Sequence, residues 1–388
     1  MRRLVLALLV LLLASPAASD YGSSSSSASV RGPGMAIPAK IYCAVGRECY
    51  VSNTQLCLSS GSLRNTAPFG FTFESNYGSF HYKGWRYTPS TEADTPLIIR
   101  ALDGNLNSLE SVTTTVDVVS KTAGSGTKNL LIIGDSLINS TGVLVSTLYN
   151  QFTTDAGGQL TFLGTSGTGN YQHEGYDGWT HEDFATSNGG SNPFWDGTEV
   201  NFQWYMSEEG FVGDIDYCVI QLGINDMWSD IGNADVTDAQ LSAIGANLNV
   251  ILDAMLDADV GYPGCQIIIS LEPIGAGDLT AIYTMYTASQ GKHWWRYERN
   301  MMKWWRYVIL NYDLDAFDAR VSVCAANLGV DRDIMYGFDD TPDKRISSRS
   351  LAYDQQWWHT DYLHPYSFGY HAMSDNLYGH LRHLMVGN

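Results

Sequence analysis

The sequence predicts an α/β protein in which a parallel-sheet α/β/α sandwich follows a small all-β sandwich. Two observations lead to this fold class. After residue 128, short apolar runs alternate with segments of helical periodicity, an order typical of a parallel sheet covered on both faces. Before residue 120, short runs of alternating polar and apolar residues are separated by turn residues, as in antiparallel sandwiches.

The first residues have the pattern of a secretory signal peptide. Met1-Arg2-Arg3 is basic, the run from Leu4 to Ala14 is apolar, and small residues follow up to Ser19. The apolar run is too short to cross a bilayer. We therefore expect a signal peptide over residues 1–19, a Ser- and Gly-rich linker over 20–35, no later membrane-spanning segment, and a secreted mature protein, extracellular or periplasmic.

The all-β region is expected over residues 36–121. It has few helix signals, and its apolar runs are short and rich in β-branched or aromatic residues. The strand candidates are Phe71–Glu74, Leu97–Ala101 and Val112–Val119, and Asp103–Asn105 is a turn candidate.

The α/β region is expected over residues 127–388, after a Gly- and Thr-rich boundary. Its clearest helix runs from Asp238 to about Asp257, where apolar residues recur on one face. Thr237 and Gln240 form a capping box in front of this helix. The strand candidates are Leu130–Gly134, Leu160–Gly164, Tyr217–Gly223 and Gln266–Ser270.

Charge and cysteine usage exclude several classes of protein. A formal net charge of −19 argues against nucleic-acid binding, which needs clustered Lys and Arg, and against anionic membranes, but it suits neutral substrates such as glycan esters. No Cys/His spacing resembles a zinc site. Export permits disulfides, and one local bridge is expected among Cys43, Cys49 and Cys57, whereas Cys218 and Cys265 are expected to be buried free thiols.

The most informative stretch is the apolar run 130–134 and the Gly134-Asp135-Ser136 that ends it. It places Ser136 on a strand-to-helix turn, where its hydroxyl can face outward and its N–H lies near a helix N-terminus. Ligands of parallel sheets bind at the carboxyl ends of the strands. Gly-Asp-Ser alone is an ordinary turn tripeptide, so a nucleophile needs partners elsewhere in the chain.

Three further segments offer such partners. Asn225 follows another strand and is either an amide donor for an oxyanion or a simple turn residue. Either Gly178 or Gly175 can bring a backbone N–H close to a ligand. Asp361 precedes His364 by three residues, a spacing at which the carboxylate can fix the imidazole tautomer and leave Nε2 as a base; a surface ion pair is the alternative.

Together these four blocks resemble the SGNH/GDSL hydrolase superfamily, in which they occur in the same order. The blocks here are Gly134-Asp135-Ser136, Gly178, Gly223-Ile224-Asn225-Asp226 and Asp361-Tyr362-Leu363-His364. The resemblance implies a flavodoxin-like catalytic domain over 127–388. It implies Ser136 as nucleophile, His364 as general base and Asp361 as the acid that orients it. It further implies an oxyanion hole formed by the N–H groups of Ser136 and Gly178 and the Asn225 amide.

The β-rich region resembles the accessory sandwich that precedes some secreted esterase domains of this superfamily. Residues 41–48 carry this looser resemblance. The expected chemistry is ester hydrolysis through an acyl-serine, which needs no metal and no organic cofactor.

Tryptophans indicate the substrate class. Ten of the eleven lie between Trp179 and Trp358, and exposed aromatic faces stack on sugar rings. We therefore expect removal of O-acetyl groups from a polysaccharide or oligosaccharide, with Trp179, Trp357 and Trp358 as candidate substrate contacts. The helical stretch 293–306 is expected to bury most of its aromatic stripe. The alternatives are a general short-chain or lipid esterase, and a glycan-binding protein with an inactive hydrolase domain.

Overall fold

The structure is a computed structural model. The expected signal peptide and most of the expected linker lie outside the residues that it describes. Gly34 and Met35 already belong to the folded region: their backbone N–H groups donate to the Glu110 carboxylate, and Met35 is buried. The described residues are 34–56, 70–81, 83–139, 142–230, 234–275, 294–313, 316–332, 338–339, 358–359, 364–365 and 367–386.

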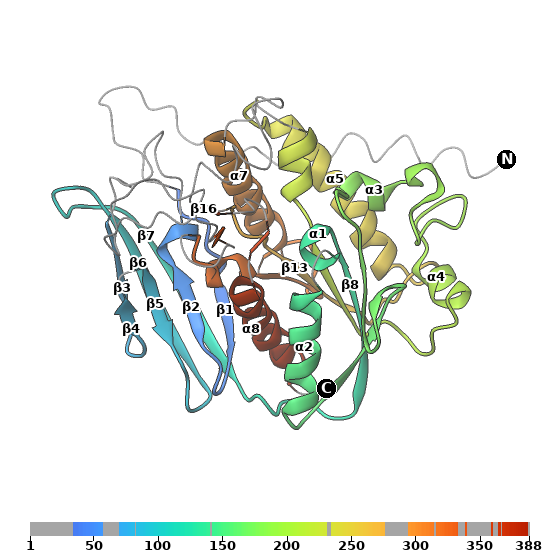
Figure 1. Cartoon of the computed structure of the whole chain (residues 1–388), viewed down its shortest axis with the longest axis horizontal. Coiled ribbons are helices and arrows are strands. Elements are labelled where there is room, and N and C mark those ends of the chain that lie inside the picture. The colour runs from blue at the N-terminus through green and yellow to red at the C-terminus, as the bar shows by residue number, and fades with distance from the viewer. Residues whose placement is uncertain are drawn as a thin grey trace. The chain divides into compact units, whose positions relative to one another are not determined.

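Two small sheets make up the N-terminal region (Figure 1). Their strands are β1 Lys40–Ala44, β2 Cys49–Ser52, β3 Gly70–Glu74, β4 Ser79–His81, β5 Gly84–Tyr87, β6 Ala93–Leu102 and β7 Ser108–Val119. One sheet has the order β1-β7-β6-β3 and the other β2-β5-β4. Only the β1–β7 pair is parallel among them. Both sheets contribute buried side chains to one hydrophobic cluster, which includes Ile41, Val51, Trp85 and Ile99.

The strands expected in this region coincide with β3, with part of β6 and with most of β7. The expected local disulfide joins Cys43 to Cys49, and so links the end of β1 to the start of β2. Cys57 lies outside the described residues. Cys218 and Cys265 are buried free thiols as expected, and Cys324 is another.

A seven-stranded sheet forms the centre of the α/β region, with the order β10-β11-β8-β12-β13-β14. β9 pairs with the first half of β8, and β11 pairs with its last two residues. All pairs are parallel except β10–β11. The parallel sheet and its four expected strands are thus confirmed. The bounds are β8 Thr127–Gly134, β9 Gln159–Leu163, β10 Ser166–Thr168, β11 Tyr171–Gly175, β12 Tyr217–Gln221, β13 Gln266–Ser270 and β14 Val321–Cys324; a separate short pair is β15 Phe338–Asp339 with β16 Trp358–His359.

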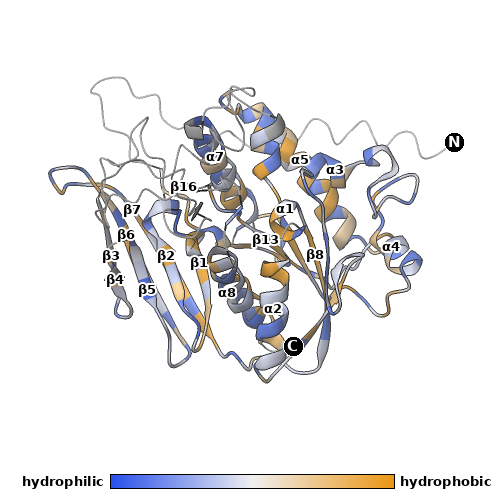
Figure 2. Ribbon diagram, in the orientation of Figure 1, coloured by the Kyte–Doolittle hydropathy of each residue, from blue (hydrophilic) through white to orange (hydrophobic). Residues whose placement is uncertain are grey.

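Helices pack around this sheet, α2 against α8 and α3 against α5. Figure 2 shows hydrophobic colour gathered on the central strands, whereas α2 and α5 carry both colours. Four short 3-10 or π segments complete the described elements. The helices are α1 Ser136–Asn139, α2 Val143–Thr154, α3 His181–Ala185, α4 Phe202–Glu208, α5 Asp238–Leu256, α7 Trp294–Tyr312 and α8 Ser367–Leu384.

Helix α5 begins where the sequence predicts. The Thr237 hydroxyl accepts from the Gln240 N–H, and the Gln240 side chain accepts from the Thr237 N–H, so the capping box is confirmed. Among the described residues one helix, α5, is long and apolar enough to cross a membrane by length and composition. In the structure most of its large apolar side chains, including Leu248 and Leu252, are buried in the core of the α/β region, whereas Val250 is exposed.

Helix α7 confirms the expected aromatic stripe. Tyr297, Met301, Trp304 and Trp305 are each at most 2% exposed. These side chains belong to the hydrophobic core, so Trp304 and Trp305 are unavailable to a glycan.

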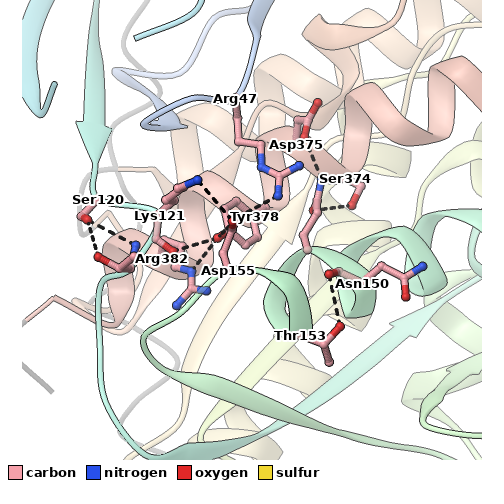
Figure 3. Close-up of polar contacts among 12 residues, drawn as sticks. Arg47, Ser120, Lys121, Asn150, Thr153, Asp155, Ser374, Asp375, Tyr378 and Arg382 are labelled. Carbon is pink, nitrogen blue, oxygen red and sulfur yellow. Dashed lines mark hydrogen bonds and ion pairs between the residues drawn. The ribbon is translucent and has the colours of Figure 1, made fainter. Parts of the chain in front are cut away.

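A buried carboxylate, Asp155, joins the N-terminal sheets to the α/β region (Figure 3). Asp155 follows α2 and accepts hydrogen bonds from Arg47, in the β1–β2 connection, at 2.7 Å and from the Tyr378 hydroxyl of α8 at 2.8 Å. The Lys121 ammonium lies 3.5 Å away. The Arg47 guanidinium also lies over the Tyr378 ring, 5.1 Å from its centroid. One carboxylate therefore holds together segments from both regions.

Replacing Asp155 by Asn should lower the free energy of unfolding by about 1–3 kcal/mol, because two buried charge-assisted hydrogen bonds are weakened. Burial opposes ionisation of Asp155, but hydrogen bonds from Arg47 and Tyr378 outweigh it, and the pKa of this carboxyl lies below its ordinary value. A lowered folded-state pKa means that the stabilisation is complete above the unfolded-state pKa of about 3.9. It is lost as the pH falls through the folded-state pKa.

Urea denaturation at pH 7 and pH 3 checks this, with Asp259→Asn at an exposed carboxylate as the matched control. The difference between wild type and Asp155→Asn should shrink at pH 3, and Asp259→Asn should stay within about 0.5 kcal/mol of wild type. A difference that is the same at both pH values would contradict the role given to the Asp155 charge.

Candidate active site

The candidate site lies at the carboxyl edge of the central sheet. β8 and β12 are adjacent and parallel, and their register pairs Gly134 with Gln221. Ser136 comes two residues after the end of β8, and Asn225 comes four residues after the end of β12. Ser136 and Asn225 are 89 positions apart in the chain. The register of β8 and β12 brings them to the same edge of the sheet, where the carboxyl ends of parallel strands meet and ligands bind.

The Ser136 hydroxyl has an imidazole partner. The distance from Ser136 Oγ to His364 Nε2 is 2.8 Å, a hydrogen-bonding distance at which a base can take a proton from a hydroxyl. Both residues are partly exposed, so the pair is accessible. Asp361, expected to orient His364, lies outside the described residues.

Asp135 shapes the turn on which Ser136 stands. Its side chain accepts from the Leu137 N–H at 2.9 Å, and its carbonyl accepts from the N–H groups of Ile138 and Asn139. These bonds cap α1 in the way that an Asp N-cap does. In the described part of the chain no hydrogen bond uses the Ser136 N–H, which leaves it available to an oxyanion.

The end of β11 and the turn that follows it distinguish the two candidate glycines, Gly175 and Gly178. Gly178 has φ +82° in a turn closed by the Trp179 N–H and the Tyr176 carbonyl, and a Cβ there would meet nothing within 4 Å. This φ explains why glycine stands at the third turn position. Gly175 lies in β11, donates its N–H to His173 Nδ1 at 3.1 Å, and is crowded by Ile138. Geometry therefore favours Gly178 as the oxyanion donor.

The Asn225 amide contacts the residue before Ser136 and the residue after Gly178. Its Nδ2 donates to Asp135 Oδ2 and to the Trp179 carbonyl, both at 3.0 Å. A π-helix, Asp226–Asp230, follows directly; such segments recur at functional sites. Both amide hydrogens of Asn225 therefore already have acceptors.

Two features behind the site were missed by the sequence reasoning. Asp226 Oδ2 lies 2.9 Å from His181 Nδ1, and Asp226 Oδ1 accepts from the His181 N–H. This buried pair fastens the segment after Gly178 to the segment of Asn225. Glu272 is the second feature: it is buried two residues after β13 and accepts from the Ile224 N–H at 2.6 Å. Its signal in the sequence is a carboxylate two residues after an apolar strand, the same position that Ser136 occupies after β8.

Of the candidate substrate tryptophans, only Trp179 has a described side chain. Its ring is partly buried and stacks on Tyr176 with centroids 4.3 Å apart. Trp357 lies outside the described residues, and Trp358 is placed only as part of the backbone of β16. Among the residues that the structure describes, no group of three or more His, Cys, Asp and Glu is arranged to hold a metal ion.

No family model matches the chain, and no curated protein matches it. Solved structures do resemble its fold. A carbohydrate esterase of family 3 from Talaromyces cellulolyticus is 14% identical, with a TM-score of 0.38 over 66% of this chain and 98% of its own. A carbohydrate acetylesterase from Sinorhizobium meliloti is 12% identical (TM-score 0.36, 66% and 99% covered). An extracellular lipase from Streptomyces rimosus is also 12% identical (TM-score 0.30, 62% and 93%).

Proposed function

We propose that this protein is a serine esterase that works through an acyl-serine intermediate. The observation that carries the proposal is the 2.8 Å contact between Ser136 Oγ and His364 Nε2 at the carboxyl edge of the sheet. A serine hydroxyl is a weak nucleophile until an adjacent base accepts its proton. In the described part of the chain the N–H groups of Ser136 and Gly178 make no hydrogen bond. They supply what an acyl-transfer transition state needs next, donors for a developing oxyanion.

The proposed reaction has two steps. Ser136 Oγ attacks the ester carbonyl while His364 Nε2 takes the hydroxyl proton, and the carbonyl oxygen becomes an oxyanion. The N–H groups of Ser136 and Gly178 and the Asn225 amide stabilise that charge, and His364 returns the proton to the departing alcohol. Water then attacks the acyl-serine by the same route and releases the acid. In this proposal Asp361 orients His364.

We further propose that the substrate is an O-acetylated polysaccharide or oligosaccharide and that the protein is secreted. The basic and apolar start of the chain supports export. The net charge of −19 favours uncharged esters over anionic ones. Trp179, partly exposed next to Gly178, supports sugar recognition by stacking. The buried tryptophans of α7 give no such support.

Substrate preference tests this proposal. We expect the protein to release acetate from acetylated xylan or pectin, and to hydrolyse p-nitrophenyl acetate with a kcat/KM at least about tenfold above that for a long-chain p-nitrophenyl ester. A preference for long chains would replace the glycan proposal by a lipid esterase. Binding to a polysaccharide without hydrolysis of any ester would support the inactive glycan-binding alternative.

A further inference from the structure

Two carboxyl groups face each other beneath the candidate oxyanion hole. Asp135 is 0% exposed and Glu272 is 1% exposed. Their side chains are within hydrogen-bonding contact of one another. Asp135 directly follows β8 and Glu272 comes two residues after β13, so the contact spans the strand β12 that lies between these two strands.

The hydrogen bonds of the pair are complete only if it carries a proton. Asp135 accepts from the Leu137 N–H and from the Asn225 amide. Glu272 Oε2 accepts from the Ile224 N–H, while Glu272 Oε1 is buried and finds no donor among the described residues. A proton on Glu272 supplies the donor that its contact with Asp135 otherwise lacks, because two ionised carboxylates can only accept.

The electrostatic surroundings also favour a proton on the Asp135–Glu272 pair. Two ionised carboxylates cannot share a buried site at low cost. Burial raises the pKa of Asp135 to about 7, and burial with the Asp135 charge raises the pKa of Glu272 well above its ordinary value. Asp226 adds negative charge to both, and His364 favours the ionised form of Asp135. The proton belongs on Glu272, because Asp135 has two N–H donors to stabilise its charge and Glu272 has one.

We propose that Glu272 is a positioning residue that remains a neutral acid, donates a hydrogen bond to Asp135, and so holds Asp135 where it orients the Asn225 amide toward the oxyanion. This rests on the proposed esterase function. Glu272 acts twice on the same segment, because its other oxygen fixes the backbone of Ile224, next to Asn225. If the pair loses its proton, the two carboxylates repel each other and the Asn225 amide loses its fixed acceptor.

Glu272→Ala and Glu272→Gln test this with p-nitrophenyl acetate. Glu272→Ala should lower kcat by about 10–10²-fold, less than loss of the donor itself, with KM changed less than about threefold. In Glu272→Gln the amide N–H₂ can donate to Asp135 and the amide oxygen can accept from Ile224, so kcat should recover to within about fivefold of wild type. Wild type should lose activity at alkaline pH as the pair gives up its proton, and Glu272→Gln should lack that decline.

Glu174→Ala is the matched control, since Glu174 is also 0% exposed and hydrogen-bonded but accepts from the hydroxyls of Tyr205 and Thr165. Two outcomes would overturn the role of Glu272: a kcat loss no larger than in Glu174→Ala, or no rescue by glutamine. The infrared difference spectrum between wild type and Glu272→Gln at pH 7 should show the C=O stretch of a protonated acid. Its absence also overturns the proposal, independently of any activity. Hydrolysis that persists in Ser136→Ala would instead refute the proposed function.

Discussion

Ser136→Ala should reduce kcat for p-nitrophenyl acetate by about 10⁴–10⁶-fold, the range seen when a serine nucleophile is removed. Ser136 Oγ is the atom that forms the acyl intermediate. It lies 2.8 Å from His364 Nε2, and the alanine variant has no nucleophile at that position. Residual hydrolysis should come from the oxyanion donors alone, which act without a nucleophile on the enzyme.

The measurement needs evidence that the fold survives and that the intermediate forms at this residue. Ser146→Ala is the matched control: Ser146 is a partly buried serine of α2 whose hydroxyl donates to the Val143 carbonyl, and its removal should leave kcat within about twofold of wild type. Mass spectrometry after reaction with a fluorophosphonate should find one adduct on wild type and none on Ser136→Ala. A labelled Ser136→Ala protein, or one that keeps more than a tenth of the wild-type kcat, would place the nucleophile elsewhere.

The sequence predicted those parts of the fold that local pattern controls. The apolar run before Gly134 became β8, and the Thr237–Gln240 capping box set the start of α5. The helical spacing in α7 identified side chains that are buried. Each of these features depends on residues close together in the chain, so periodicity and capping chemistry suffice to find them.

Contacts between strand ends could not be predicted in this way. The Asp135–Glu272 pair depends on the order β8-β12-β13 in the sheet and on the register of these strands. The order of strands in a sheet cannot be predicted from the residues of any one strand. The hydrogen bond from Arg47 to Asp155 could not be predicted either, because it joins residues of two different regions of the chain. α5 shows the opposite limit: it is long and apolar enough to cross a membrane, yet most of its large apolar side chains pack in the core of the structure.

Asn225→Ala has the next largest expected effect, a decrease in kcat of about 10²–10³-fold with little change in KM, because an oxyanion donor acts mainly in the transition state. The resting geometry favours the lower end of that range. One amide hydrogen is held by Asp135 and the other by the Trp179 carbonyl, so the substrate oxygen gains a bond only by taking the place of that carbonyl. The free energy of the exchange is smaller than that of a new bond to an unused donor.

Asn192→Ala is the control, because its amide also donates to two backbone carbonyls, those of Phe184 and Thr186, in a buried position. Its loss should lower stability but should change kcat less than about threefold. Asn225→Asp separates donor loss from packing loss, because it keeps the shape of the side chain but removes both hydrogens. It also adds one more acidic group beside Asp135, Glu272 and Asp226, so its kcat should fall at least as far as that of Asn225→Ala. If both Asn225 variants kept kcat within about threefold of wild type, the amide would serve only to tie Trp179 to Asp135, and the N–H groups of Ser136 and Gly178 would form the oxyanion hole alone.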